Sequence, residues 1–255
     1  MHQLIPLTAA HHLHTAVVED AALIYAASQH LLNVRISEIS QVIADVPVFF
    51  SRHQQSGQWL VSGLYSVSPS QNLWVQGREW LGSYQPVCMQ TYPLLLGSDP
   101  SQLMLTNDPR VLQSVLDSAS TATATQLLDA QGQPTAFLRQ QKAMLDKDLQ
   151  QEYLTFQFVK TVSALGLIKE LDVHLMQADG SSQTIKGLAT VDEDKLQMLS
   201  AEQLQQLQHQ GYLLLLHGIL LSITRLNRLI QLHNKHADQS PLKSIKLEIS
   251  RSAHG

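Results

Sequence analysis

The chain has few cysteines, charges and aromatic residues, and each shortage excludes a class of protein. Cys88 is the only cysteine in 255 residues, so neither an intramolecular disulfide nor a thiolate metal cluster can form. Charged residues make up 15% of the chain and the formal net charge is −4. Because nucleic-acid surfaces need a basic patch, we expect no nucleic-acid partner. The hydrophobic fraction of 44% is nevertheless that of a folded globular protein.

Long apolar runs and targeting signals are also missing. The strongest run, YLLLLHGILLSI at residues 212–223, is interrupted by His217 and Ser222 and is shorter than the roughly 20 residues that span a bilayer. The first 20 residues lack the basic and apolar regions of a signal peptide. We therefore expect a soluble, cytoplasmic protein without a transmembrane segment, in which residues 212–233 form a buried core helix.

The order of local patterns predicts an α+β fold. The first half is β-rich with antiparallel hairpins: residues 46–67 read as one hairpin, followed by strands near 73–75 and 102–106. A long central helix follows from Pro134 to Leu165, with Gly166 as its stop signal. A second hairpin spans 171–191, and a C-terminal helical segment closes the pattern, including a Ser200-x-x-Gln203 capping box. On the central helix, one face is expected to carry Leu138, Leu145, Leu149, Phe156 and Val159.

Composition shifts suggest how this fold is divided. Residues 1–233 are expected to form one α+β unit, with a weak subdivision near 113–133. Residues 113–125 (QSVLDSASTATAT) are small, polar and weakly patterned, which is typical of a linker. Residues 234–255 are expected to form an exposed tail, with a strand conceivable at 245–249.

Catalytic and metal-binding motifs are absent from the sequence. It contains no Gly-x-Ser-x-Gly, no P-loop, no Gly-x-Gly-x-x-Gly and no His-Glu-x-x-His. His11, His12 and His14 lack a partner motif and are interpreted as a solvated segment, so no metal and no cofactor are expected. The lone Cys88, with apolar neighbours, is interpreted as a buried structural thiol.

Two constellations could form a binding site. The first is an aromatic segment with an arginine, a composition found on binding surfaces; the alternative is a long loop pinned to the core by its aromatic rings. The second is His217 inside the apolar run, with Arg225 nearby on the same helix; the alternative is a core histidine bonded to a backbone carbonyl. The candidate ligand-binding residues are Trp74, Arg78, Trp80, Tyr84, Tyr92, His217 and Arg225.

Several short patterns occur in order along residues 4–230. They are Ile5-Pro6-Leu7 with a histidine soon after, Tyr25-Ala26, Ile36-Ser37-Glu38-Ile39, Val46-Pro47-Val48-Phe49, Gly63-Leu64-Tyr65, Asn72-Leu73-Trp74-Val75, Tyr84-Gln85-Pro86, Tyr92-Pro93-Leu94, Gly132-Gln133-Pro134-Thr135 and Val191-Asp192-Glu193. In this order they resemble the SapC family. The chain departs from that family at two places: Val34-Arg35 replaces a Val-Pro-Leu-like step, and Asp45 replaces a tyrosine.

The resemblance implies a soluble bacterial protein and supplies no catalytic residues. Genes of the family often lie beside flavin-dependent halogenase-like and cupin-like enzymes. The leading hypothesis is thus a non-catalytic accessory protein that binds a peptide, a glycan or such a partner enzyme, as a monomer or a homo-oligomer. The alternatives are an enzyme with an unrecognised active site near His217 and a surface-layer-associated protein.

Overall fold

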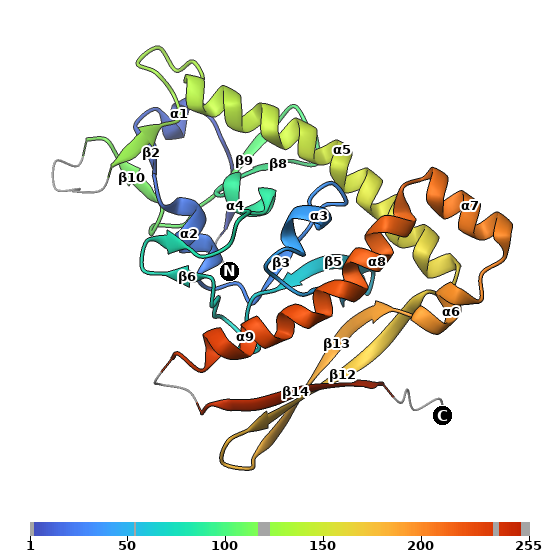
Figure 1. Cartoon of the computed structure of the whole chain (residues 1–255). Helices are drawn as coiled ribbons and strands as arrows, with labels where there is room; N and C mark the ends of the chain where they lie inside the picture. Colours follow the sequence, from blue (N-terminus) through green and yellow to red (C-terminus); the bar gives the residue numbers. More distant parts are fainter. Residues whose placement is uncertain (1–2, 54, 117–122, 237–239, 251–255) are drawn as a thin grey trace.

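The computed structural model describes residues 3–53, 55–116, 123–236 and 240–250 and confirms the α+β class (Figure 1). Its main sheet has six strands in the order β14-β12-β13-β4-β5-β3, and all neighbouring strands run antiparallel. The predicted hairpins at 46–67 and 171–191 are both present as the pairs β4–β5 and β12–β13. The strands of this sheet are β3 (Leu31–Asn33), β4 (Val48–Arg52), β5 (Trp59–Leu64), β12 (Ile168–Gln177), β13 (Ser182–Val191) and β14 (Leu242–Ile249).

Three smaller sheets are built from the N-terminal half of the chain. Their strand orders are β1-β9-β8, β10-β2-β11 and β6-β7, and each pairing is antiparallel. The strands are β1 (Leu4–Pro6), β2 (Thr15–Val18), β6 (Val75–Gln76), β7 (Glu79–Trp80), β8 (Leu94–Leu96), β9 (Leu103–Thr106), β10 (Leu112–Ser114) and β11 (Ala124–Gln126).

The helices are concentrated in the second half of the chain. Short helices interrupt the N-terminal half: α1 (Ala9–His12), α2 (Ala21–Ala26), α3 (Ile39–Val42) and α4 (Val87–Gln90). The long central helix α5 (Ala136–Ala164) begins at Thr135, whose hydroxyl accepts from the Leu138 amide, and ends before Gly166, whose φ of +68° favours glycine. The remaining elements are α6 (Glu193–Gln197), α7 (Ala201–His209), α8 (Tyr212–Ser222), the 3-10 turn η1 (Ile223–Arg225) and α9 (Leu226–His233). The capping box of Ser200 and Gln203 is present at the start of α7.

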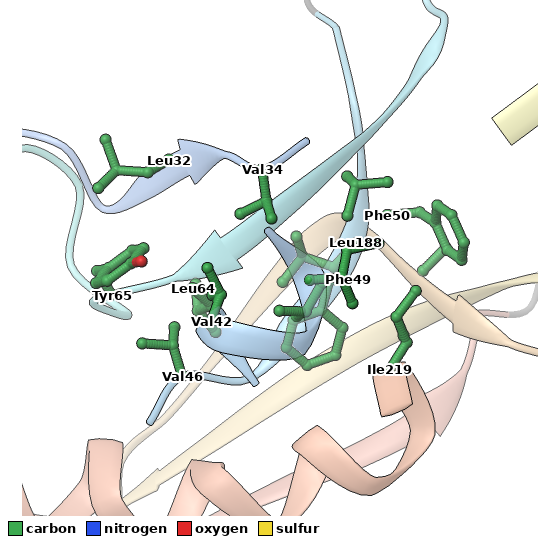
Figure 2. Close-up of a cluster of buried hydrophobic side chains, with 14 of the residues drawn as sticks. Leu32, Val34, Val42, Val46, Phe49, Phe50, Leu64, Tyr65, Leu188 and Ile219 are labelled. Atoms are coloured by element: carbon green, nitrogen blue, oxygen red, sulfur yellow. The ribbon is translucent and has the colours of Figure 1, made fainter. Parts of the chain in front are cut away.

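The main hydrophobic core encloses β4. Phe49 and Phe50 are both fully buried, and because successive strand residues point to opposite faces, both faces of the sheet are covered there (Figure 2). The Phe50 ring stacks on Phe158 of α5, with 6.2 Å between centroids. On the α8 side, the Ser222 hydroxyl accepts from the Val48 amide at 2.9 Å.

A second, smaller core lies under the N-terminal half of α5. Leu138 and Leu145 of the helix belong to this cluster, together with Val17 of β2 and Leu105 of β9, whereas Phe158 belongs to the main core. α5 therefore bridges two hydrophobic cores, since Leu138 and Leu145 are buried in the smaller one and Phe158 and Val162 in the main one.

Two expectations about the C-terminal region are wrong. Residues 242–249 form β14, which pairs with β12 from Leu171 to Gln177, so the strand conceived at 245–249 is confirmed and this stretch is not an exposed tail. Residues 237–239 and 251–255 lie outside the described part of the chain. Nor is the segment Tyr212–His233 one continuous buried helix: η1 interrupts it, and Leu214 and Leu221 are 76% and 71% exposed. By length and composition alone this segment is also apolar enough to cross a membrane, but here one side packs against β13 and β4.

The segment predicted as a linker also takes part in a sheet. Its described ends overlap β10 and β11, which both pair with β2, while residues 117–122 lie outside the described part. Backbone hydrogen bonds to a shared partner strand do not depend on side-chain pattern, so the sequence pattern gave no sign of these strands.

Candidate functional site

A cleft runs along the flank of α5 at the junction of the two cores. Three adjoining hollows of about 530, 310 and 200 Å³ form it, and all three are lined by Arg35. From α5 the cleft takes residues between Met144 and Val159, where the helix passes from one core to the other. Between Leu145 and Thr155 the helix buries no side chain, so this part of α5 remains accessible from the cleft.

Arg35 joins the floor of the cleft to α5. Its Nε and Nη2 donate to the two carboxylate oxygens of Asp148, each at 2.7 Å, and Nη2 lies 3.6 Å from Glu152. The Arg35 and Asp148 side chains are only 19% and 14% exposed, so this bidentate pair is screened less than a surface ion pair. Glu152 is 60% exposed, so the cluster of Arg35, Asp148 and Glu152 has one excess negative charge, which faces the cleft.

Behind Arg35, a buried carboxylate ties together the loops that shape the cleft. Glu38 is 4% exposed and accepts hydrogen bonds from the Arg35 amide (2.8 Å), the Val87 amide (2.7 Å) and the Tyr84 hydroxyl (2.8 Å). Burial raises the pKa of the Glu38 carboxyl, and the three hydrogen bonds counteract part of that shift. Because its oxygens are occupied by the fold, Glu38 acts as a structural tie between α3 and α4.

Two stacked tyrosines form the aromatic wall at the end of the cleft near β8. The rings of Tyr25 and Tyr92 are parallel to within 18°, with centroids 4.4 Å apart. The Tyr92 hydroxyl donates to Asp108 at 2.8 Å, and Asp108 also binds the Arg110 guanidinium at 2.7 Å. The hydrogen bonds from Arg110 hold the pKa of Asp108 well below its usual range, so this carboxylate stays charged and fixes Tyr92.

Cys88, which was expected to be a buried structural thiol, lines the same cleft. It is half-buried, and its Sγ lies 3.4 Å from the carbonyl oxygen of Asn33. Desolvation raises the pKa of the thiol to about 12. At neutral pH Cys88 is therefore protonated, and it is poorly suited to nucleophilic catalysis.

This protonation state predicts slow alkylation of Cys88. At pH 8, the thiolate fraction of a thiol with a pKa near 12 is roughly a thousandfold smaller than that of one near 9, so we expect iodoacetamide to label the folded chain at least about a hundredfold more slowly than the chain in denaturant. Mass spectrometry over time measures both rates at this single cysteine. Equal rates would show that the thiol is neither desolvated nor protonated in the fold.

The structure divides the predicted aromatic site. Trp74 is completely buried and packs edge-on against Tyr65 at 5.5 Å, so it belongs to the core and not to a ligand surface. Trp80 is half-buried and donates from Nε1 to the Tyr84 carbonyl at 2.9 Å. Arg78 is exposed and pairs with Asp20 at 3.0 Å. The alternative of a loop pinned by its aromatic rings thus describes Trp74 and Trp80, whereas Tyr84 and Tyr92 line the cleft.

His217 and Arg225 lie apart from the cleft. His217 is exposed on α8, which corrects its expected position inside a buried run, and its Nδ1 lies 2.8 Å from the Leu213 carbonyl oxygen. Arg225 is exposed and donates to the Ile43 carbonyl at 3.3 Å. Neither residue lines the hollows around Arg35, so the structure does not join them to Tyr84 and Tyr92.

Sequence reasoning missed the charged centre of the cleft. Arg35 and Asp148 are 113 positions apart, and an isolated charge on a loop or a helix is usually a solvated one. One signal was present: four residues quoted for the family resemblance, Tyr25, Glu38, Tyr84 and Tyr92, all line the cleft. Arg35, one of the departures from that resemblance, lies between them.

The fold and the cleft define a mixed α+β protein with an open surface site, and among the described residues no group of three or more His, Cys, Asp or Glu side chains is placed to hold a metal ion. The family model described as SapC matches residues 7–229, which is most of the chain. The protein therefore belongs to the SapC family. No curated protein and no solved structure matches the chain.

Proposed function

We propose that this chain is a bacterial, cytoplasmic accessory protein that binds an extended peptide segment of a partner protein in the cleft along α5. The observation that carries the proposal is the exposure of the apolar side chains of Leu149 and Phe156, 42% and 47%, where they line the cleft. Both were expected on the core face, and a partner's side chains would cover them.

The dimensions of the cleft favour a polypeptide over a compact ligand. Met144 to Val159 covers about 22 Å at 1.5 Å per helical residue, enough for roughly seven residues of extended chain. The lining combines apolar side chains with the polar atoms of Asn33, Arg35 and Glu152, so it offers contacts both for the side chains and for the backbone groups of a peptide. The partner would be an enzyme or another protein carrying such a segment.

The proposal predicts a selective loss of affinity when the cleft is made polar. A random peptide library displayed on phage would be panned against the chain, and enriched peptides would be titrated by fluorescence anisotropy. Leu149→Lys is expected to weaken binding at least tenfold, since a charge would replace an apolar contact. Leu149 is partly exposed, so the variant should fold normally.

Leu221→Lys is the matched control because Leu221 is also an exposed leucine on a helix, 71% exposed, but on α8 outside the cleft. The affinity of this variant for the enriched peptides should remain within twofold of the affinity of the unchanged chain. The absence of any enriched peptide, or equal affinity for the Leu149 variant, would refute the proposed site.

A further inference from the structure

The strand β14 presents an open edge of the main sheet. It is eight residues long, pairs on one side with β12, and has no strand on its other side among the residues the structure describes (Figure 1). Natural proteins usually shorten, cover or charge such edges because unpaired backbone groups accept another strand. This edge is long and carries charges of both signs, Lys246 and Glu248, and Ile249 on it is 62% exposed.

The hydrogen bonds to β12 determine which residues of β14 face outward. The Ser250 amide donates to the Glu170 carbonyl at 3.0 Å, and the pairing is regular from there to Ser244. In an antiparallel pair, alternate residues direct their amide and carbonyl groups to the same side. Residues 245, 247 and 249 therefore direct their backbone groups away from β12, toward the open edge.

We propose that a second copy of this chain pairs antiparallel with this edge, with Leu247 opposite Leu247 of the second copy on the two-fold axis. In that register Lys246 lies opposite Glu248 on one face, twice by symmetry, and Ile245 lies opposite Ile249 on the other face. The pairing joins two six-stranded sheets into one, and it does not depend on the function proposed for the cleft.

Neighbouring registers are poorer matches. Moving the axis to Lys246 places two lysines opposite each other, and moving it to Ile245 places Lys243 opposite Leu247. The register with Leu247 on the axis pairs opposite charges and covers the exposed Ile249 with an apolar side chain. Lys246 is exposed, and the Glu248 side chain is 67% exposed with its Oε2 lying 3.5 Å from His174 Nε2. Because both side chains reach solvent, both charges remain available to a partner strand.

Charge reversals test the register through complementation. Sedimentation velocity over a concentration series is expected to show a species of twice the 28.4 kDa chain mass. Lys246→Glu and Glu248→Lys should each weaken this dimer at least tenfold, because each places like charges opposite each other twice. An equimolar mixture of the two variants should restore the dimer, since both pairs then have opposite charges again.

Lys186→Glu, an equal charge change at an exposed position of β13, is the control and should leave dimerisation unchanged. The proposal is overturned if the chain stays at the mass of one copy at every concentration. It is also overturned if both single variants still dimerise normally, or if their mixture does not recover the dimer.

Discussion

Replacing Trp74 with alanine is expected to lower the free energy of unfolding by about 3–5 kcal/mol, the range for large aromatic residues removed from a packed core. Trp74 has no exposed surface and contacts Tyr65 edge-on at 5.5 Å. Tyr65 also contacts Trp80 at 5.5 Å, so the cavity left by Trp74 lies inside an aromatic cluster. Urea unfolding followed by circular dichroism measures the change.

Two further variants separate packing from hydrogen bonding at Trp74. Its indole Nε1 is buried and has no partner among the described residues, so Trp74→Phe removes an unpaired donor together with some volume. We expect Trp74→Phe to cost about 1–2 kcal/mol, clearly less than alanine. If Trp74→Ala lowers the free energy of unfolding by less than about 1 kcal/mol, Trp74 does not anchor the core and is again a candidate ligand-binding residue.

Glu38→Ala is expected to destabilise the protein by about 3 kcal/mol or more. The substitution leaves the Arg35 amide, the Val87 amide and the Tyr84 hydroxyl without their acceptor, and each buried unsatisfied group costs about 1–3 kcal/mol. We expect less than the sum of these three costs, because water can enter the space left by the carboxylate and accept some of the hydrogen bonds. Urea unfolding again gives the free energy.

Glu38→Gln and Glu79→Ala are the comparisons for this prediction. The glutamine carbonyl can still accept from Tyr84 and Val87, while its amide faces the Arg35 amide, so we expect an intermediate loss. Glu79 is an exposed glutamate on β7, and its removal should change stability by no more than about 0.5 kcal/mol. Equal stability of the Glu38→Ala and Glu79→Ala variants would contradict the role of Glu38 as a buried tie.

The cleft and the two stability predictions concern the same loops. Trp74, Trp80 and Tyr65 fix the aromatic segment, and Glu38 fixes the Tyr84 hydroxyl and the start of α4. Loosening either anchor would displace the walls that hold Arg35 and Cys88. Binding tests at the cleft therefore use Leu149, which is partly exposed and anchors nothing.

Local patterns in the sequence determined the elements. Alternation with turn residues defined the hairpins at 46–67 and 171–191, the helical period with Gly166 defined α5, and Ser200 with Gln203 defined the start of α7. Each of these features is set by contacts between residues close in sequence, or by a turn that brings two neighbouring strands together.

Only the tertiary structure decided which sides of these elements face a core. The pattern of α5 placed Leu149 and Phe156 on the same apolar face as Leu145 and Val159, but α5 spans the gap between two cores, so its middle lines a cleft. The position of β14 at the edge of the sheet was likewise decided by the tertiary structure. Residues 242–249 form the sheet edge only because β12, about 70 positions earlier, offers it a free side.

The charged centre of the cleft depends on the same long-range arrangement. Arg35 and Asp148 meet across 113 positions because the segment after β3 lies against α5, where the Ile36 amide also donates to the Thr155 hydroxyl. The sequence shows which residues carry charge, but burial and partners follow from how distant segments approach each other. The fold class was therefore readable from local periodicity, whereas the site was decided by packing between segments that no local pattern connects.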